Sequence, residues 1–242
     1  LLITILFIAH PISTEAVNAV SYREDLLAFL FYTATLAIYL FIRTHGTLSN
    51  KWRSLLYAAS CLLYSIALFS KEMAVTLPFI IYCYERVYMD KNKKRSALIN
   101  YYNIGYIVVI LIYAYLRFYY FQNPMAGGFY IPAIKERLIT VPLLILSYIK
   151  LLLFPVSLSA EYVFLHVESV FFALFIVSCF VIFYLLAFRI NKSIFFGMLF
   201  FIITSLPIYN IVPIANPLAE RYMYLPSVGF FIFMVSTICL IP

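Results

Sequence analysis

The chain alternates between long apolar runs and short polar segments. A helix that crosses a bilayer needs roughly 20 apolar residues, within a range of about 17 to 25. Runs close to this length predict helices at residues 26–42, 55–69, 73–88, 103–121, 169–188, 194–212 and 225–241. Residues 1–9 have the composition of the end of another such helix. The pattern therefore predicts an all-α, polytopic integral membrane protein with about seven full spans and the end of a truncated one.

Composition supports this interpretation. Of 242 residues, 65% are hydrophobic and only 11% are charged, and the mean hydropathy is +1.00. A soluble domain carries roughly a quarter charged residues, so this chain lacks the polar residues that would cover a water-soluble core. The composition excludes a soluble enzyme, a disordered chain and a small disulfide-stabilised secreted module.

The formal charge of +7 is distributed unevenly along the chain. Loops 43–54, 85–97 and 189–193 contain ten of the 17 Lys and Arg residues but only two of the ten acidic residues. The positive-inside rule assigns these loops to the cytoplasm and the other polar segments, including 122–168, to the opposite side. The basic excess thus indicates orientation, and no nucleic-acid partner is predicted.

Residues 138–154 do not fit this topology as a simple span. The segment is apolar enough to cross, but one crossing would place the following loops on the wrong sides. We expect an interfacial or re-entrant helix inside an external loop at 122–168, with a full crossing as the alternative.

Four short polar motifs lie at predicted helix ends on the external side. They are HPISTEAV at 10–17, SYREDL at 21–26, SKE at 70–72 and NPLAERYMYLP at 216–226. Charged side chains at a membrane border are costly unless they pair or reach water, so they are candidates for function. The alternatives are a turn in water for Lys71 and Glu72, and a weak surface ion pair for Glu220 and Arg221.

The charges in these motifs indicate a chemistry. Three cations, Arg23, Lys71 and Arg221, suit a phosphate or pyrophosphate head group beside lipid. Acidic side chains suit a general base or the hydroxyls of a sugar. The acids and other candidate supporting residues are His10, Glu15, Asp25, Glu72, Glu220 and Tyr222. No metal site or cofactor is predicted.

The four motifs together resemble those of the transmembrane and tetratricopeptide-repeat family of protein O-mannosyltransferases, in the GT-C glycosyltransferase superfamily. Residues 10–17, the pattern Arg23-x-Asp25-Leu-Leu, residues 70–72 and residues 220–227 match in order and spacing. Ser13 stands where that family often has a second histidine. The GT-C pattern also has a long external loop after its seventh helix, which corresponds here to 122–168.

The resemblance implies transfer of a sugar, mannose in that family, from a polyprenyl or dolichyl phosphate to Ser or Thr of an acceptor protein. It implies phosphate binding by Arg23, Lys71 and Arg221, with the acids orienting them or the sugar. The family's catalytic base would lie before Leu1 and its tetratricopeptide repeats after Pro242, leaving one transmembrane GT-C-like domain at 1–242. The membrane would be that of the endoplasmic reticulum in a eukaryote, or the inner or plasma membrane in a bacterium.

Two other functions fit part of the pattern. One is another enzyme of lipid-linked sugar transfer. The other is a transporter, although transporter sites usually lie near the membrane midplane on broken helices, whereas the predicted spans here have charge-free centres.

Overall fold

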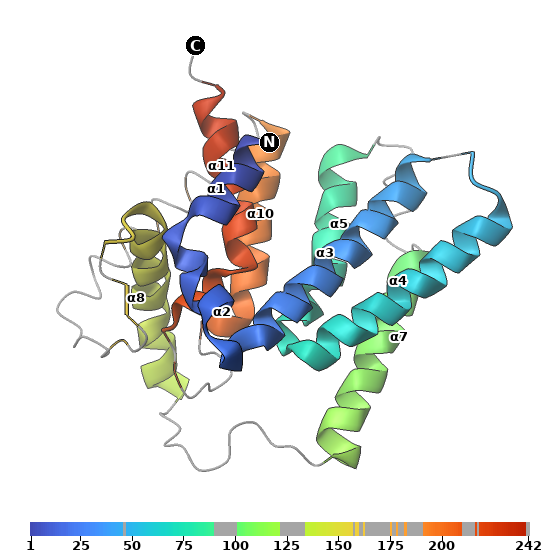
Figure 1. Ribbon diagram of the computed structural model, residues 1–242, viewed down its shortest axis with the longest axis horizontal. Coiled ribbons are helices and arrows are strands. Elements are labelled where there is room, and N and C mark those ends of the chain that lie inside the picture. Colours follow the sequence, from blue (N-terminus) through green and yellow to red (C-terminus); the bar gives the residue numbers. More distant parts are fainter. Residues whose placement is uncertain are drawn as a thin grey trace. The chain divides into compact units, whose positions relative to one another are not determined.

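The computed structural model describes residues 1–45, 47–89, 101–121, 134–156, 191–209 and 218–240, together with 158, 159, 162, 175, 178, 182 and 216. Every regular element in these residues is helical, so the all-α prediction is confirmed for them (Figure 1). The predicted helix at 169–188, apart from three isolated positions, lies outside the described residues, as do 122–133 and 163–168 of the predicted loop. Two compact units are described in turn: unit 1 is Leu1–Tyr22 with Met125–Pro242, and unit 2 is Arg23–Pro124.

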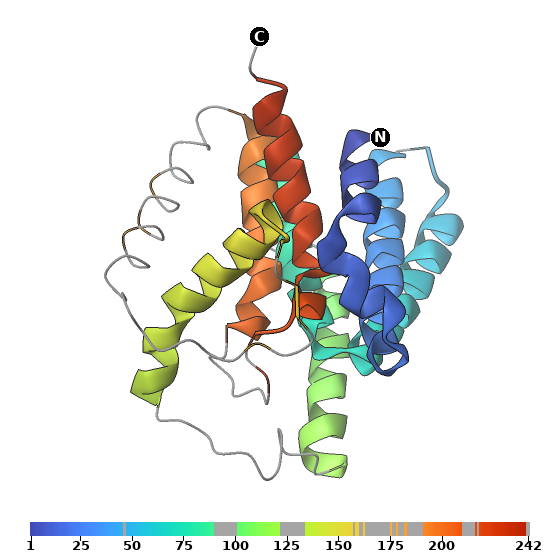
Figure 2. The same cartoon turned by 60° about the vertical axis from the view of Figure 1, so that its left-hand side comes forward.

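Unit 2 is a bundle of long helices. Its elements are α3 (Arg23–Thr44), α4 (Asn50–Ser70), the 3₁₀ turn η3 (Glu72–Thr76), α5 (Leu77–Tyr88), α7 (Tyr101–Tyr115) and the π-helical turn η4 (Leu116–Tyr120). The helices α3 and α4 run side by side, and α7 packs on α4 (Figures 1 and 2). The Ser49 side chain begins α4 by accepting a hydrogen bond from the backbone N–H of Trp52.

Three stretches in the described residues are long and apolar enough to cross a membrane: Val20–Thr44, Asn50–Ser70 and Asn103–Tyr120. They correspond to the helices predicted at 26–42, 55–69 and 103–121. At 1.5 Å per residue the 21 residues of α4 span about 31 Å, close to the thickness of the hydrocarbon core of a bilayer.

The prediction of one continuous helix at 73–88 is wrong in its first turn. Residues Glu72–Thr76 form a 3₁₀ turn, and the α-helix begins only at Leu77. Pro78 explains the boundary, because a proline lacks the N–H that a helix interior needs and is tolerated in the first turn.

The interior of unit 2 contains polar side chains that bond between helices. Tyr32 and Tyr106 are completely buried, and their hydroxyls lie 3.3 Å from Thr76 Oγ1 and 2.9 Å from Ser60 Oγ. Large aliphatic side chains such as Leu62 and Leu111 are exposed instead. Hydrogen bonds between helices and an apolar exterior are typical of helices that pack together in lipid.

Unit 1 joins the first segment of the chain to the last. Its elements are α1 (Leu2–Ala9), the 3₁₀ turn η1 (Pro11–Ser13), α2 (Thr14–Asn18), the 3₁₀ turn η2 (Val20–Tyr22), α8 (Ile134–Leu153), α10 (Lys192–Ser205), the 3₁₀ turns η5 (Leu206–Ile208) and η6 (Glu220–Met223), and α11 (Pro226–Ile238). The helix α11 packs along α10 and contacts α1, while η6 contacts η1, α2 and α8. The turn η6 therefore lies where the three parts of unit 1 meet.

The helix α8 covers most of the segment predicted as an interfacial or re-entrant helix. It extends from Ile134 to Leu153 and contains Pro142. Its Tyr148 is fully buried, and the Tyr148 hydroxyl accepts a hydrogen bond from the backbone N–H of Ala219 at 3.3 Å. The helix is thereby fixed to the residue that precedes η6, whereas its position relative to a bilayer stays a prediction.

Two glycines let α10 and α11 approach closely. A Cβ atom at Gly197 would lie 2.6 Å from the backbone nitrogen of Phe233, and one at Gly229 would overlap the backbone nitrogen of Phe201. Real Cβ atoms essentially never come so close. Small residues that bring helix backbones together are a common means of packing in membrane proteins.

We expect Gly197→Ala and Gly229→Ala each to destabilise unit 1 by about 1–3 kcal/mol, because the new methyl group meets backbone rather than a side chain that can move. Thermal unfolding of the detergent-solubilised protein measures this effect. Ile238→Ala removes a larger group from an exposed position of α11 and should leave the midpoint nearly unchanged. Equal midpoints for the glycine variants and the wild type would refute the close packing.

Candidate functional site

The first and fourth motifs meet through a buried ion pair in unit 1. Glu15 lies in the first turn of α2, and Arg221 lies in η6, which follows extended backbone at Ala219. The Arg221 guanidinium donates through Nη1 to Glu15 Oε1, and the Arg221 backbone N–H donates to Glu15 Oε2 at 2.9 Å. Both Glu15 oxygens are therefore occupied by a residue 206 positions away.

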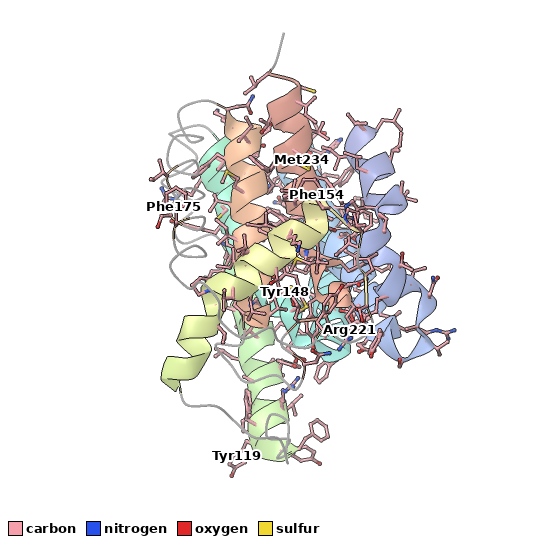
Figure 3. All side chains as sticks on the ribbon, turned by 90° about the vertical axis from the view of Figure 1, so that its left-hand side faces the viewer. Tyr119, Tyr148, Phe154, Phe175, Arg221 and Met234 are labelled. Carbon is pink, nitrogen blue, oxygen red and sulfur yellow. The ribbon has the colours of Figure 1, made fainter. Side chains whose placement is uncertain are left out.

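Two tyrosine rings complete the surroundings of Arg221. Its Cζ atom lies 3.9 Å from the ring centroid of Tyr22 and 4.8 Å from that of Tyr222. Cation–π contacts of this kind offset part of the cost of removing a guanidinium from water. Figure 3 shows Arg221 beside the blue segment that contains α1 and α2. Tyr222 was predicted as a supporting residue, whereas Tyr22 was not.

Glu220 and Arg221 do not pair with each other. Glu220 Oε1 accepts hydrogen bonds from the Tyr162 hydroxyl at 2.5 Å and from the Ser159 backbone N–H at 2.8 Å. Consecutive side chains in a 3₁₀ turn point about 120° apart, so the two neighbours reach different partners. Both are buried, 3% and 9% exposed, which contradicts the alternative of a surface ion pair. Burial and the bond to Glu220 raise the pKa of Tyr162, which keeps its hydroxyl a donor.

A cavity of about 370 Å³ opens beside these groups. It is lined by Thr14, Glu15, Asn18, Ala19, Leu158, Ser159 and Glu220. All of these residues belong to unit 1. The first motif thus supplies one wall and Glu220 of the fourth motif supplies another.

His10 holds the first motif against α8. The backbone N–H of Ile12 donates to His10 Nδ1 at 3.2 Å, which leaves Nε2 to carry the proton and donate to the Leu152 carbonyl at 3.1 Å. Burial lowers the pKa of His10, opposed by the bond to Leu152. A neutral imidazole also suits the geometry, because a second proton on Nδ1 would leave the Ile12 N–H without its acceptor.

The second and third motifs meet through another ion pair, in unit 2. Asp25 lies in the first turn of α3, where the helix dipole favours an acid, and Lys71 follows the last residue of α4 in extended backbone. Lys71 Nζ lies 2.5 Å from Asp25 Oδ1, and the two side chains are 12% and 4% exposed. The alternative of a simple turn in water is therefore contradicted for Lys71.

Glu72 and Arg23 are placed differently. Glu72 is exposed, and its Oε2 lies 3.2 Å from Nη1 of Arg117. An exposed pair of this kind contributes little to stability. Arg23 is exposed at the start of α3, and its side chain has no ion-pair partner among the described residues. Of the three predicted phosphate-binding cations, only Arg23 has no ion-pair partner among the described residues.

The burial of one acid was not predicted from the sequence. Glu85 was counted both in the helix at 73–88 and in the basic loop at 85–97; it lies within α5, is completely buried and pairs with Arg43 at 2.8 Å. The Tyr39 hydroxyl also donates to it. A signal was present: Glu85 directly follows an apolar helical run, and Tyr39 and Arg43 of α3 are four residues apart, which places them on one face of that helix.

Comparisons with models of protein families, with curated proteins and with solved structures find no match for this chain. The roles of these residues therefore depend on their geometry and chemistry.

The neutral state of His10 predicts a dependence of stability on pH. As the pH falls below about 6.5, the ordinary pKa of histidine, the unfolded chain binds a proton that folded His10 resists, so the folded state loses stability. Thermal midpoints measured between about pH 7.5 and pH 5 should fall less steeply for His10→Gln than for the wild type. His45→Gln, at an exposed histidine outside the four motifs, is the matched control. If the thermal midpoint of His10→Gln falls with decreasing pH as steeply as that of the wild type, this account is contradicted.

Proposed function

We propose that the protein is a polytopic GT-C-like membrane glycosyltransferase. It transfers a hexose, mannose by the resemblance of its motifs, from a polyprenyl or dolichyl phosphate to a Ser or Thr hydroxyl of an acceptor protein. The reaction takes place on the extracytoplasmic side, in the endoplasmic reticulum membrane of a eukaryote or the inner or plasma membrane of a bacterium.

The pairing of the four motifs carries this proposal. The first motif binds the fourth through Glu15 and Arg221, and the second binds the third through Asp25 and Lys71. Buried ion pairs are poor stabilisers compared with apolar packing, so pairs built from separate motifs favour a functional role. Their position at the ends of apolar helices supports a substrate whose head group lies at the membrane surface.

The resemblance assigns the departing phosphate to the cations of these motifs. Arg23 is exposed and unpaired among the described residues, and Arg221 uses only Nη1 of its guanidinium for Glu15, so that N–H donors remain. Lys71 is held in place by Asp25. Cations fixed before the reaction stabilise negative charge as it develops, which is a large source of catalytic rate.

The chemistry is a single displacement with inversion. The acceptor oxygen bonds to the anomeric carbon as the bond from that carbon to the phosphate oxygen breaks. The phosphate leaves with the electron pair, and a carboxylate takes the hydroxyl proton. The resemblance puts that carboxylate on an external loop that precedes Leu1.

Arg23→Ala tests the proposal because Arg23 is exposed, and its loss should leave the fold intact. We expect about 10–100-fold slower transfer of labelled mannose from polyprenyl phosphate mannose to a Ser/Thr peptide, in membranes that contain the full-length polypeptide. Lys51→Ala is the matched control, since it removes an exposed cation from a predicted cytoplasmic loop and should leave the rate unchanged. Absence of hexose transfer by the wild type from polyprenyl and dolichyl donors would refute the proposed function. Wild-type rates for Arg23→Ala would refute the role of Arg23 alone.

A further inference from the structure

We propose that the cavity in unit 1 binds the sugar of the lipid-linked donor, through hydroxyl groups held by Glu220, Asn18 and Thr14. This inference rests on the proposed function, because it names the part of the donor that the cavity receives. The resemblance implied only that acids support the phosphate-binding cations or the sugar, without identifying a pocket.

The free acceptor in the cavity is one oxygen of Glu220. Glu220 is only 3% exposed and lines the cavity. Both hydrogen bonds of its side chain use Oε1. Oε2 has no partner among the described residues. Oε2 is not among the fully buried atoms that lack a partner, so it is open to the cavity and can accept a hydrogen bond from a ligand.

The other polar side chains supply both donors and acceptors. Asn18 offers an amide N–H₂ and a carbonyl oxygen, and Thr14 offers a hydroxyl. Both residues are exposed at the cavity, and their side chains make no hydrogen bond to the described residues. A sugar hydroxyl both donates and accepts, so this combination matches a polyhydroxyl ligand. The volume of about 370 Å³ falls in the range of small-molecule sites.

Electrostatics argue against the phosphate as the occupant. Among the described residues that line the cavity there are two carboxylates and no cation. A phosphate in the cavity would face net negative charge, whereas neutral sugar hydroxyls would not. A metal ion fits less well, because both Glu15 oxygens are occupied by Arg221 and Glu220 offers a single free oxygen.

The geometry of Glu220 provides a mild variant for the test. Glu220→Gln keeps an Oε1 acceptor for Tyr162 and Ser159 but replaces Oε2 with an N–H₂ donor. Asn18→Ala acts at an exposed position, so it stays informative if Glu220→Gln fails to fold. Glu24→Gln is the matched control, because it removes the same charge from a residue that does not line the cavity.

The experiment measures the Kd of the purified full-length polypeptide for polyprenyl phosphate mannose and for bare polyprenyl phosphate. We expect the wild type and Glu24→Gln to prefer the mannose-bearing lipid by tenfold or more. Glu220→Gln and Asn18→Ala should each reduce that preference by about three- to tenfold, with the Kd for the bare lipid unchanged.

The outcomes separate the two proposals. If the wild type binds neither lipid, the proposed function fails. If the wild type binds both lipids equally, or if both variants keep the wild-type preference, the cavity does not hold the sugar although the proposed function stands. If a variant binds both lipids more weakly by the same factor, the replaced side chain supports the fold and does not contact the sugar.

Discussion

The ion pair between Glu15 and Arg221 is the interaction on which unit 1 depends. It ties the first motif of the chain to the last across 206 residues, and it places η6 against η1, α2 and α8. Burying two charges is expensive unless their remaining hydrogen-bonding groups are satisfied. Here the Arg221 backbone N–H takes the second Glu15 oxygen, and the rings of Tyr22 and Tyr222 cover the guanidinium. The same arrangement directs Glu220 away from Arg221 and toward Tyr162, which leaves one of its oxygens for the cavity.

The cost of burying a charge also determines where charges lie at the helix ends of unit 2. The outer surfaces of its helices are apolar, so charges are tolerated only where they pair, as with Asp25 and Lys71, or where they reach the surface, as with Arg23 and Glu72. In each unit an ion pair joins charges from distant segments of the chain, Glu15 with Arg221 in unit 1 and Asp25 with Lys71 in unit 2.

The sequence predicted the helices well because apolar runs of fixed length follow from bilayer thickness, as for 26–42 and 55–69. It also identified the residues of two buried ion pairs, Glu15 with Arg221 and Asp25 with Lys71, but not those of the pair between Arg43 and Glu85. It did not predict which residues form ion pairs with each other, because partners such as Glu15 and Arg221 meet only through tertiary packing. The burial of Glu85 was missed for the same reason, because its partner, Arg43, lies on another helix. The cavity could not be predicted, since it needs η6 to meet residues 158 and 159.

A double-mutant cycle on Glu15 and Arg221 tests the central claim most directly. Glu15→Gln and Arg221→Met each leave one buried charge without its partner, whereas the double variant leaves none. Each single change should lower the free energy of unfolding in detergent by about 3–5 kcal/mol. The double variant should be at least about 2 kcal/mol more stable than the sum of the two single losses predicts. Losses that add to within about 0.5 kcal/mol would contradict the claim that this pair holds the first and last motifs together.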